Sequence, residues 1–182
     1  MCIRDRDINE LRPLGRTARG VKSMNLREGD KLVSMDVLTS ILVDQLAKIE
    51  DLTEDPDDNV EENFSDGPWV LIASSFGLGK RVPVAQFRLQ KRAGMGLRAI
   101  KFRIKDDQLV CLKVLGEGEE LLLVTEKGVI VRTNADKISQ QSRAATGVKL
   151  QRLDDGDHLS EVVLVPHEQI DGKDQPSSVE QN

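Results

Sequence analysis

The sequence predicts an all-β fold, in which four-stranded blades repeat about every 50 residues as part of a propeller-like array. Two observations predict it. Short apolar runs alternate with turns that contain Gly or Asp over residues 69–165. The same order of runs recurs after a shift of 51 residues, which is typical of an architecture built from one repeated unit.

The repeat is visible as identity between residues 69–106 and residues 120–157. Eight of these 38 aligned positions are identical, and several of the others are conservative replacements. A third copy lies earlier and is anchored on Gly20, with Arg16 four residues before it and Lys22 two residues after it. The same basic offsets recur around Gly96 and Gly147, so the chain contains three copies of one unit.

Each complete copy is expected to hold four strands, the first two forming a hairpin around a glycine turn. The hairpin glycines are Gly77 and Gly128, and an Asp-rich turn separates the third strand from the fourth. The expected strands are 70–74, 80–84, 97–104 and 109–115 in the second copy, and 121–125, 129–133, 148–153 and 159–165 in the third. Leu26, Phe102 and Leu153 occupy equal positions after the anchoring glycines and are expected in the core.

The domain organisation follows from the repeat. The expected units are an incomplete blade (1–38), an amphipathic helix with an acidic linker (39–66), a second blade (67–116), a third blade (117–165) and a disordered acidic tail (166–182). The hairpin glycine of the first copy would fall at residue 1, and Met1–Arg6 fits no repeat position. The chain therefore reads as a fragment of a larger array. The helix, with Leu38, Leu42, Leu46 and Ile49 at helical spacing, could bind a partner or be a structural excursion.

Charge is strongly partitioned along the chain. Residues 67–153 carry sixteen Lys/Arg against seven Asp/Glu, a net charge of +9, whereas residues 41–66 carry −9 and residues 154–182 carry −7. A basic body with acidic appendages is typical of a surface that binds a polyanion and of segments that compete for it. The alternative is that the acidic segments only keep an ordinary domain in solution.

Several classes of chemistry are excluded by composition. Cys2 and Cys111 are the only cysteines and His158 and His167 the only histidines, so a disulfide framework or a histidine-rich metal site is not expected. The chain has no Tyr, which excludes a tyrosine nucleophile. No apolar run approaches the roughly 18 residues of a membrane span, and no secretory leader opens the sequence. We therefore expect a cytoplasmic protein with no membrane partner.

The recurring basic residues are the candidate site. In a circular array, equal positions come to equal places on the rim, so one basic pair per blade would form a positive track for nucleic-acid phosphates. The candidate DNA-binding residues are Arg16, Arg19, Lys22, Lys91, Arg92, Arg98, Arg143 and Lys149. The alternative is that they form ion pairs with Asp30, Asp106 and Asp157 in the neighbouring turns. For Arg81 and Arg132, on the hairpin strands, simple solvent exposure explains the recurrence equally well.

Four motifs carry a family resemblance. They are Gly15–Lys22 (GRTARGVK), Gly29–Val33 (GDKLV), Gly77–Pro83 (GLGKRVP) and Gln90–Gly96 (QKRAGMG). Through these motifs, about residues 7–165 resemble the carboxy-terminal domain of DNA gyrase A subunits. Their sequence is most similar to those of cyanobacterial and plastid members. The match runs through three successive copies in order.

This resemblance implies a six-bladed β-pinwheel that wraps DNA around its rim and so makes ATP-dependent negative supercoiling directional. By order and by the acidic tail, the copies resemble the last three blades. The implied partners are double-stranded DNA, the breakage-reunion domain of the parent and the gyrase B subunit, in an A2B2 heterotetramer. The family's cleavage tyrosine lies in another domain, and ATP and Mg belong elsewhere in the complex, so no cofactor and no catalysis are expected here.

The resemblance has one departure. Gln90–Gly96 is similar to the diagnostic box of the family's first blade, Gln-basic-Arg-Gly-Gly-basic-Gly, but Ala93 replaces a glycine and Met95 replaces a basic residue. We interpret it as a degenerate relative of the box. Two alternatives stay open: the carboxy-terminal domain of topoisomerase IV, which has fewer and more degenerate blades, and a propeller that binds proteins through the helix and acidic linker.

Overall fold

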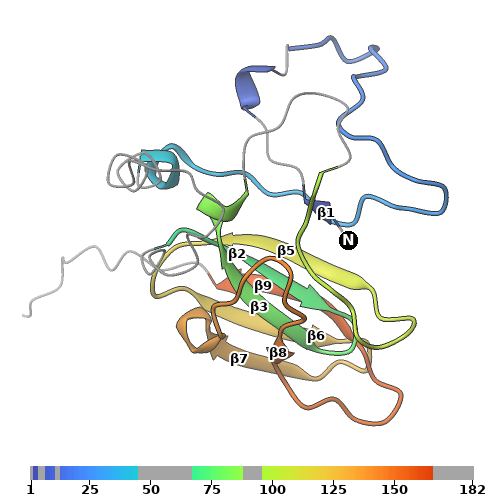
Figure 1. The fold of residues 1–182 in the computed structure, drawn as a ribbon, viewed down its shortest axis with the longest axis vertical. Coiled ribbons are helices and arrows are strands. Elements are labelled where there is room, and N and C mark those ends of the chain that lie inside the picture. Colours follow the sequence, from blue (N-terminus) through green and yellow to red (C-terminus); the bar gives the residue numbers. More distant parts are fainter. Residues whose placement is uncertain (1, 4–6, 11–12, 45–66, 88–95, 166–182) are drawn as a thin grey trace, which may run out of the picture.

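The structure is a computed structural model that describes residues 2–3, 7–10, 13–44, 67–87 and 96–165 (Figure 1). Most of its regular elements are strands, and the strands pair antiparallel in sheets, which confirms the all-β class. The strands are β1 (Cys2–Ile3), β2 (Trp69–Ser74), β3 (Leu78–Pro83), β4 (Leu97–Arg98), β5 (Leu109–Leu115), β6 (Glu120–Thr125), β7 (Ile130–Asn134), β8 (Val148–Lys149) and β9 (Leu159–Val165). Three short 3-10 helices are η1 (Ile8–Glu10), η2 (Val84–Gln86) and η3 (Ala135–Lys137).

The two hairpins form as the sequence predicts. In the second repeat (residues 67–116), β2 pairs with β3 around Gly77, and in the third repeat (residues 117–165), β6 pairs with β7 around Gly128. Both glycines have positive φ, +73° and +84°, which glycine adopts without the steric cost that other residues meet. The fourth strands β5 and β9 pair with the first strands β2 and β6, and an irregularity interrupts both ladders at the same place, Ala73/Ser74 and Val124/Thr125.

The third strand of the second repeat, and likewise that of the third, differs from the expectation. It is only two residues long, and it pairs with the hairpin of the preceding repeat and not with its own. β8 of the third repeat completes the sheet β5-β2-β3-β8, with Leu78 opposite Lys149 and Gly79 opposite Val148. The sheet of the third repeat, β7-β6-β9, has three strands among the described residues. Since β5 already occupies one edge of β2, the outer edge of β3 is where a further strand can add.

The same exchange links the first repeat (residues 1–38) to the second. β4 pairs with β1, with Cys2 opposite Arg98 and Ile3 opposite Leu97. This is the register of β3 and β8, shifted by one repeat. Cys2–Ile3 is therefore the first-repeat equivalent of Leu78–Gly79, at the start of β3. The prediction that Met1–Arg6 fits no repeat position is wrong for these two residues.

The 51-residue alignment also slips by one residue after the third strand. β5 begins at Leu109 and β9 at Leu159, so the equivalent of Asp157 is Asp107 and not Asp106. Oδ1 of Asp107 accepts the backbone N–H of Phe76 at 3.1 Å, and Oδ1 of Asp157 accepts that of Lys127 at 3.1 Å. In both repeats this aspartate ties the turn before the fourth strand to the turn of the hairpin.

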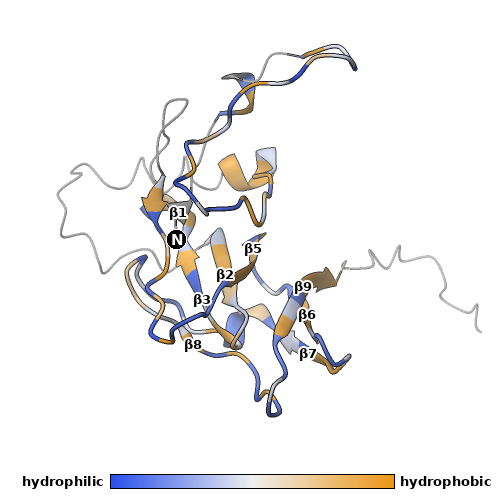
Figure 2. Cartoon of the chain, turned by 90° about the vertical axis from the view of Figure 1, so that its right-hand side faces the viewer, coloured by the Kyte–Doolittle hydropathy of each residue, from blue (hydrophilic) through white to orange (hydrophobic). Residues whose placement is uncertain are grey.

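Both faces of β2 are buried, and each contributes to a separate hydrophobic core. Leu71 and Ala73 face a core shared with the sheet of the third repeat, whereas Val70 and Ile72 face one built with Phe87 and other side chains of the second repeat. Figure 2 shows hydrophobic stretches along β2, β5 and β9, with more hydrophilic turns between them. The sheet of the second repeat therefore buries both of its faces, one of them against the sheet of the third repeat, as expected for successive blades.

The three residues that are predicted in the core after the anchoring glycines differ in their packing. Phe102 packs against the second core, and Leu153 lies close to Gly77 of the preceding hairpin. Leu26 is 46% exposed, so its assignment to the core is wrong in this structure. Its equivalents pack near the hairpin of the preceding repeat, and the described part of the chain places no such hairpin before Leu26.

The end of the first repeat runs beside β5. Ser34 Oγ donates to the carbonyl of Leu112 at 3.0 Å, and the backbone N–H of Val114 donates to Asp36 Oδ2 at 2.9 Å. Leu38 packs against the second core, and residues 40–44 are helical, within the predicted helix. The rest of that helix, the acidic linker and the tail lie outside the described residues. No helix among the described residues is long and apolar enough to cross a membrane.

Candidate nucleic-acid interface

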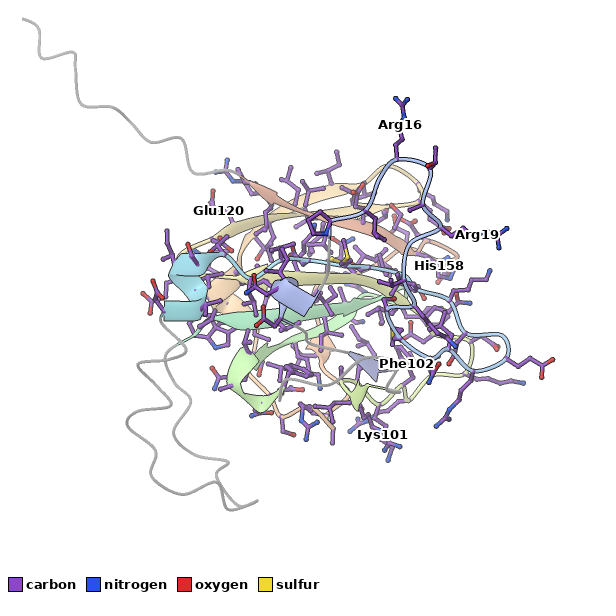
Figure 3. The ribbon with its side chains drawn as sticks, turned by 90° about the horizontal axis from the view of Figure 1, so that it is seen from above. Arg16, Arg19, Lys101, Phe102, Glu120 and His158 are labelled. Carbon is purple, nitrogen blue, oxygen red and sulfur yellow. The ribbon has the colours of Figure 1, made fainter. Side chains whose placement is uncertain are left out.

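Six of the eight predicted DNA-binding residues lie within the described part of the chain. Five are exposed and Arg143 is half-buried; the exposed ones are Arg16, Arg19, Lys22, Arg98 and Lys149. Arg16 and Arg19 project away from the body of the molecule on the same connecting segment (Figure 3). Lys91 and Arg92 lie outside the described residues, so their role stays a prediction.

The arginines of the first and third repeats occupy the same position of the same turn. The backbone N–H of Ala18 donates to the carbonyl of Gly15 at 3.0 Å, and that of Ala145 donates to the carbonyl of Ser142 at 3.2 Å. Arg16 and Arg143 each follow the first residue of their turn. The anchoring glycines that close these loops, Gly20, Gly96 and Gly147, all have positive φ, between +80° and +96°. The repeat therefore holds in backbone conformation as well as in sequence.

The second basic position is carried by the exchanged strands. Arg98 on β4 and Lys149 on β8 are both exposed, and they stand opposite equivalent residues, Cys2 and Leu78, of the preceding repeat. Strand exchange thus fixes one exposed cation at the same place on each of two neighbouring sheets. Lys22, the equivalent residue of the first repeat, is exposed but lies outside any strand.

The alternative, in which carboxylates of the neighbouring turns neutralise these cations, is not what the structure shows. Within the described residues, no carboxylate makes an ion pair with any of the six basic residues. Asp30 instead accepts the backbone N–H of Arg27 at 3.2 Å, and Asp157 accepts the backbone N–H groups of Lys127, in the hairpin turn, and of His158. Burial raises the pKa of Asp157, but hydrogen bonds from Thr125, Lys127 and His158 outweigh it and hold the pKa below its ordinary value. The basic side chains remain available to an anion.

Arg81, which recurs with Arg132 in the hairpins, is buried and joins the second repeat to the third. Its guanidinium donates from Nε to the carbonyl of Ile138 at 2.9 Å and from Nη1 to Asp136 Oδ1 at 2.9 Å, and its centre lies 4.7 Å from the ring of Trp69. Arg132 is exposed and forms an ion pair with Glu120, which raises the pKa of the guanidinium. Solvent exposure therefore explains Arg132 but not Arg81.

Sequence reasoning missed Lys80, which is fully buried. Its Nζ donates to three carbonyl oxygens of the repeat-three loop (residues 142–147): to Ser142 at 2.7 Å, to Arg143 at 2.8 Å and to Ala145 at 2.8 Å. Burial lowers the pKa of Lys80 to about 8. Strand alternation could have located it, because Lys80 lies on the same face of β3 as the buried Val82.

Glycine allows this loop to lie directly on β3. A Cβ at Gly147 would be 2.7 Å from the carbonyl oxygen of Gly79, closer than two such atoms can approach. The backbone N–H of Leu150 donates to the carbonyl of Gly77 at 2.8 Å just beyond this contact. The backbone of the loop is therefore anchored to the preceding repeat, while Arg143 and Lys149 remain at its surface. Among the described residues, no group of three His, Cys, Asp or Glu side chains could hold a metal ion.

Comparison with known families gives one extended match. Residues 7–39, 68–110 and 119–166 match the family described as "DNA gyrase C-terminal domain, beta-propeller". The chain is 52% identical over 166 residues to the DNA gyrase A subunit of Synechocystis sp., covering 88% of this chain and 19% of that protein. It is 38% identical over 158 residues to the DNA gyrase A subunit of Staphylococcus epidermidis, covering 87% of this chain and 15% of that protein. The chain thus spans less than a fifth of the length of these relatives.

Two solved structures have a similar fold. A DNA gyrase A C-terminal domain superimposes with a TM-score of 0.63 at 29% identity, covering 85% of this chain and 44% of that one. The C-terminal domain of a DNA topoisomerase IV superimposes with a TM-score of 0.64 at 24% identity, covering 86% of this chain and 41% of that one. At that identity the second likeness shows the fold alone. The three repeats correspond to less than half of either solved domain.

Proposed function

Because this chain belongs to the DNA gyrase C-terminal domain, beta-propeller family, we propose that it is a non-catalytic module that binds duplex DNA and wraps it across its repeats. The observation that carries the proposal is that Lys22, Arg98 and Lys149 recur as exposed cations at equal positions of successive repeats, with no ion-pair partner among the described residues. The segment of residues 67–153, which holds the last two, has a net charge of +9. Equivalent cations on stacked sheets follow one another around the array, as the phosphates do along a curved duplex.

Binding through phosphates requires little else from the protein. Arginine and lysine side chains supply charge-assisted hydrogen bonds to phosphate oxygens, and these contacts position a duplex without reading its sequence. Among the described residues, the longest helix has only five residues (40–44), so none resembles a helix that reads base edges in a major groove. Affinity should therefore depend on salt and on the ease of bending the duplex, and only weakly on base sequence.

In the parent protein, wrapping by this module would present a crossing DNA segment to the breakage-reunion domain, and the gyrase B subunit would complete an A2B2 assembly. ATP and Mg act on other domains of that assembly, and this chain contributes binding alone. Its place is the cytoplasm, at the bacterial nucleoid, or the plastid if the source is a plant. A topoisomerase IV parent is less well supported, because the relatives named as DNA gyrase A subunits reach 52% identity.

The test has two parts. Fluorescence anisotropy with two labelled duplexes of unrelated sequence should give equal affinities, and replacing Arg16, Arg98, Arg143 and Lys149 with Ala should weaken both equally. Ligating a nicked plasmid in the presence of the chain should then shift the linking number of the closed product. Equal binding with no shift would show that the chain binds DNA without wrapping it, and strong preference for one duplex would contradict backbone recognition.

A further inference from the structure

We propose that Lys80 is a positioning residue that turns two backbone amides of the repeat-three loop outward, those of Ala144 and Thr146, as a binding site for a DNA phosphate. The proposal rests on the DNA-binding function above and deepens it. It assigns to this loop a contact made by backbone amides beside the side chain of Arg143, and it gives the buried lysine a role.

The geometry begins with the ammonium group. All three of its protons are directed to carbonyl oxygens of one loop, at 2.7–2.8 Å, and the side chain has no exposure to solvent. A buried ammonium is tolerated only when its hydrogen bonds are satisfied, so the three carbonyls are held inward together. They belong to residues 142, 143 and 145, which lie within a single turn.

The direction of the carbonyls fixes the direction of the amides. In a planar trans peptide, the N–H of one residue points opposite to the C=O of the residue before it. With the carbonyls of Arg143 and Ala145 turned toward Lys80, the N–H groups of Ala144 and Thr146 must point away from it. Neither N–H has a hydrogen-bond acceptor among the described residues, Ala144 is exposed, and Thr146 is half-buried. The third amide, that of Arg143, is occupied by Gln86 Oε1 at 3.2 Å.

Other contacts prevent the loop from rearranging. Gln141 Oε1 accepts the N–H of Gly147 at 3.1 Å, the carbonyl of Ala145 accepts the N–H of Lys101 at 3.4 Å, and Gly147 lies against the backbone of Gly79. Two outward N–H groups held in a fixed turn are donors of the kind that backbone sites offer to phosphate oxygens. The arginine side chain of the same turn adds the charge that a phosphodiester requires. The amides of Ala144 and Thr146 would fix the phosphate, and Arg143 would neutralise it.

The first repeat offers an internal comparison. Its turn from Gly15 to Ala18 has the same hydrogen bond as the turn from Ser142 to Ala145, and Thr17 and Arg19 take the places of Ala144 and Thr146. No lysine holds the first turn among the described residues. In the hairpin of the third repeat, the equivalent of Lys80 is Val131. The hydrogen bonds from a buried lysine to the loop are therefore a feature of the junction between the second and third repeats.

The test follows backbone amides directly, in the unmodified chain. We expect the amide protons of Ala144 and Thr146 to move downfield in nitrogen–proton correlation spectra as a short random-sequence duplex is added, more than those of Thr17 and Arg19. Inorganic phosphate serves as the second probe. Shifts with phosphate but none with duplex would overturn the assignment to DNA. Duplex binding that leaves both amides unmoved would overturn the inference while the proposed function stands, whereas no shift anywhere in the spectrum would sink the proposed function itself.

A pair of variants isolates the role of the lysine. Lys80→Met keeps the length of the side chain and removes the ammonium, and Lys137→Met, on η3, removes one exposed charge elsewhere. We expect Lys80→Met to lose the two downfield shifts and to weaken duplex binding roughly tenfold, about the value of one hydrogen bond to a charged group. Lys137→Met should retain both shifts. If Lys80→Met folds and keeps the shifts and the affinity of the unmodified chain, the positioning role is wrong, and if it does not fold, the spectra of the unmodified chain decide.

Discussion

Arg81 and Asp136 join two repeats through a single ion pair, with Nη1 of Arg81 2.9 Å from Oδ1 of Asp136. At the equivalent position of the third repeat, Arg132 bonds to Glu120 of its own hairpin and lies at the surface. The two arginines thus have the same place in the sequence repeat and different physical roles. The difference arises because a following repeat covers β3, whereas none covers β7 in the described chain.

This contrast gives the first prediction. Arg81→Ala should lower the free energy of unfolding by about 2–4 kcal/mol, because it removes a nearly buried hydrogen-bonded cation and leaves the carbonyl of Ile138 without its donor. Arg132→Ala removes the same side chain from an exposed ion pair and should leave stability nearly unchanged. Urea denaturation of the two variants checks this. Equal losses of stability would show that Arg81 does not join the repeats.

The second prediction concerns the contact between Gly147 and Gly79. Gly147→Ala should cost about 1–2 kcal/mol for the positive φ, with about 1–3 kcal/mol more because the new methyl group meets the Gly79 backbone. Gly128→Ala is the matched control, since Gly128 has a similar φ of +84° and open space around its Cβ position. Thermal unfolding should therefore separate the two variants. If both variants lose the same stability, Gly147 does not lie as close to the backbone of Gly79 as the structure shows.

The third prediction is a pH dependence that follows from Lys80. Burial lowers the pKa of Lys80 to about 8 from its ordinary value of 10.5, so between these values the unfolded chain holds a proton that the folded chain has released. Stability from this group therefore rises with pH across that window and is constant below it. Cys111 acts oppositely, because burial raises the pKa of its thiol to about 11 and the folded chain then retains the proton. The two effects overlap above pH of about 9.

Comparing the unmodified chain with Lys80→Met separates the pH dependence due to Lys80 from that due to Cys111, because Cys111 is present in both proteins. Between pH 7 and pH 9.5, the free energy of unfolding should rise by about 2 kcal/mol more in the unmodified chain than in the variant. Urea titrations at the two pH values measure this difference. Parallel pH profiles would mean that Lys80 keeps an ordinary pKa, as it would if water reached it.

The hairpins and the fourth strands could be predicted from the sequence because their signals are local. Alternating apolar residues fix which face of a strand is buried, and a glycine with positive φ, such as Gly77 or Gly128, marks the turn. The partner of the third strand carries no such signal. β4 and β8 are two residues long, and nothing in Leu97–Arg98 or Val148–Lys149 distinguishes pairing within a repeat from pairing with the preceding one.

The equivalent positions of the candidate residues were predictable to the same extent, while their role in DNA binding stays a prediction. Counting from the anchoring glycine located Arg16, Arg98, Arg143 and Lys149, because repeated positions become equivalent places in a repeated fold. Counting from the anchoring glycine did not identify Lys80, because its hydrogen-bond partners lie in a loop 62–65 residues further along the chain. Its identity as a lysine suggested a surface residue, and only the packing of the next repeat on β3 buries it.

The fourth prediction concerns the acidic segments, which lie outside the described residues. Residues 53–66 contain seven acidic and no basic side chains, and they are tethered to a segment of net charge +9. A tethered polyanion competes with DNA phosphates at a high effective concentration, and salt screens that competition. Deleting residues 53–66, or separately residues 168–182, should raise duplex affinity, more at low salt than at high salt. Replacement by an uncharged linker of equal length is the control. Unchanged affinity at both salt concentrations would leave these segments a spacer or solubilising role.

The salt dependence of duplex binding tests most directly whether the recurring cations bind DNA phosphates. The logarithm of the association constant should fall linearly with the logarithm of the salt concentration. In the variant with Ala at Arg16, Arg98, Arg143 and Lys149, the slope should be flatter by up to about 0.9 for each phosphate that the variant no longer neutralises. Circular dichroism and urea denaturation establish that this variant is folded. A folded variant with the same affinity and the same slope as the unmodified chain would contradict the assignment of these residues to the DNA-binding surface.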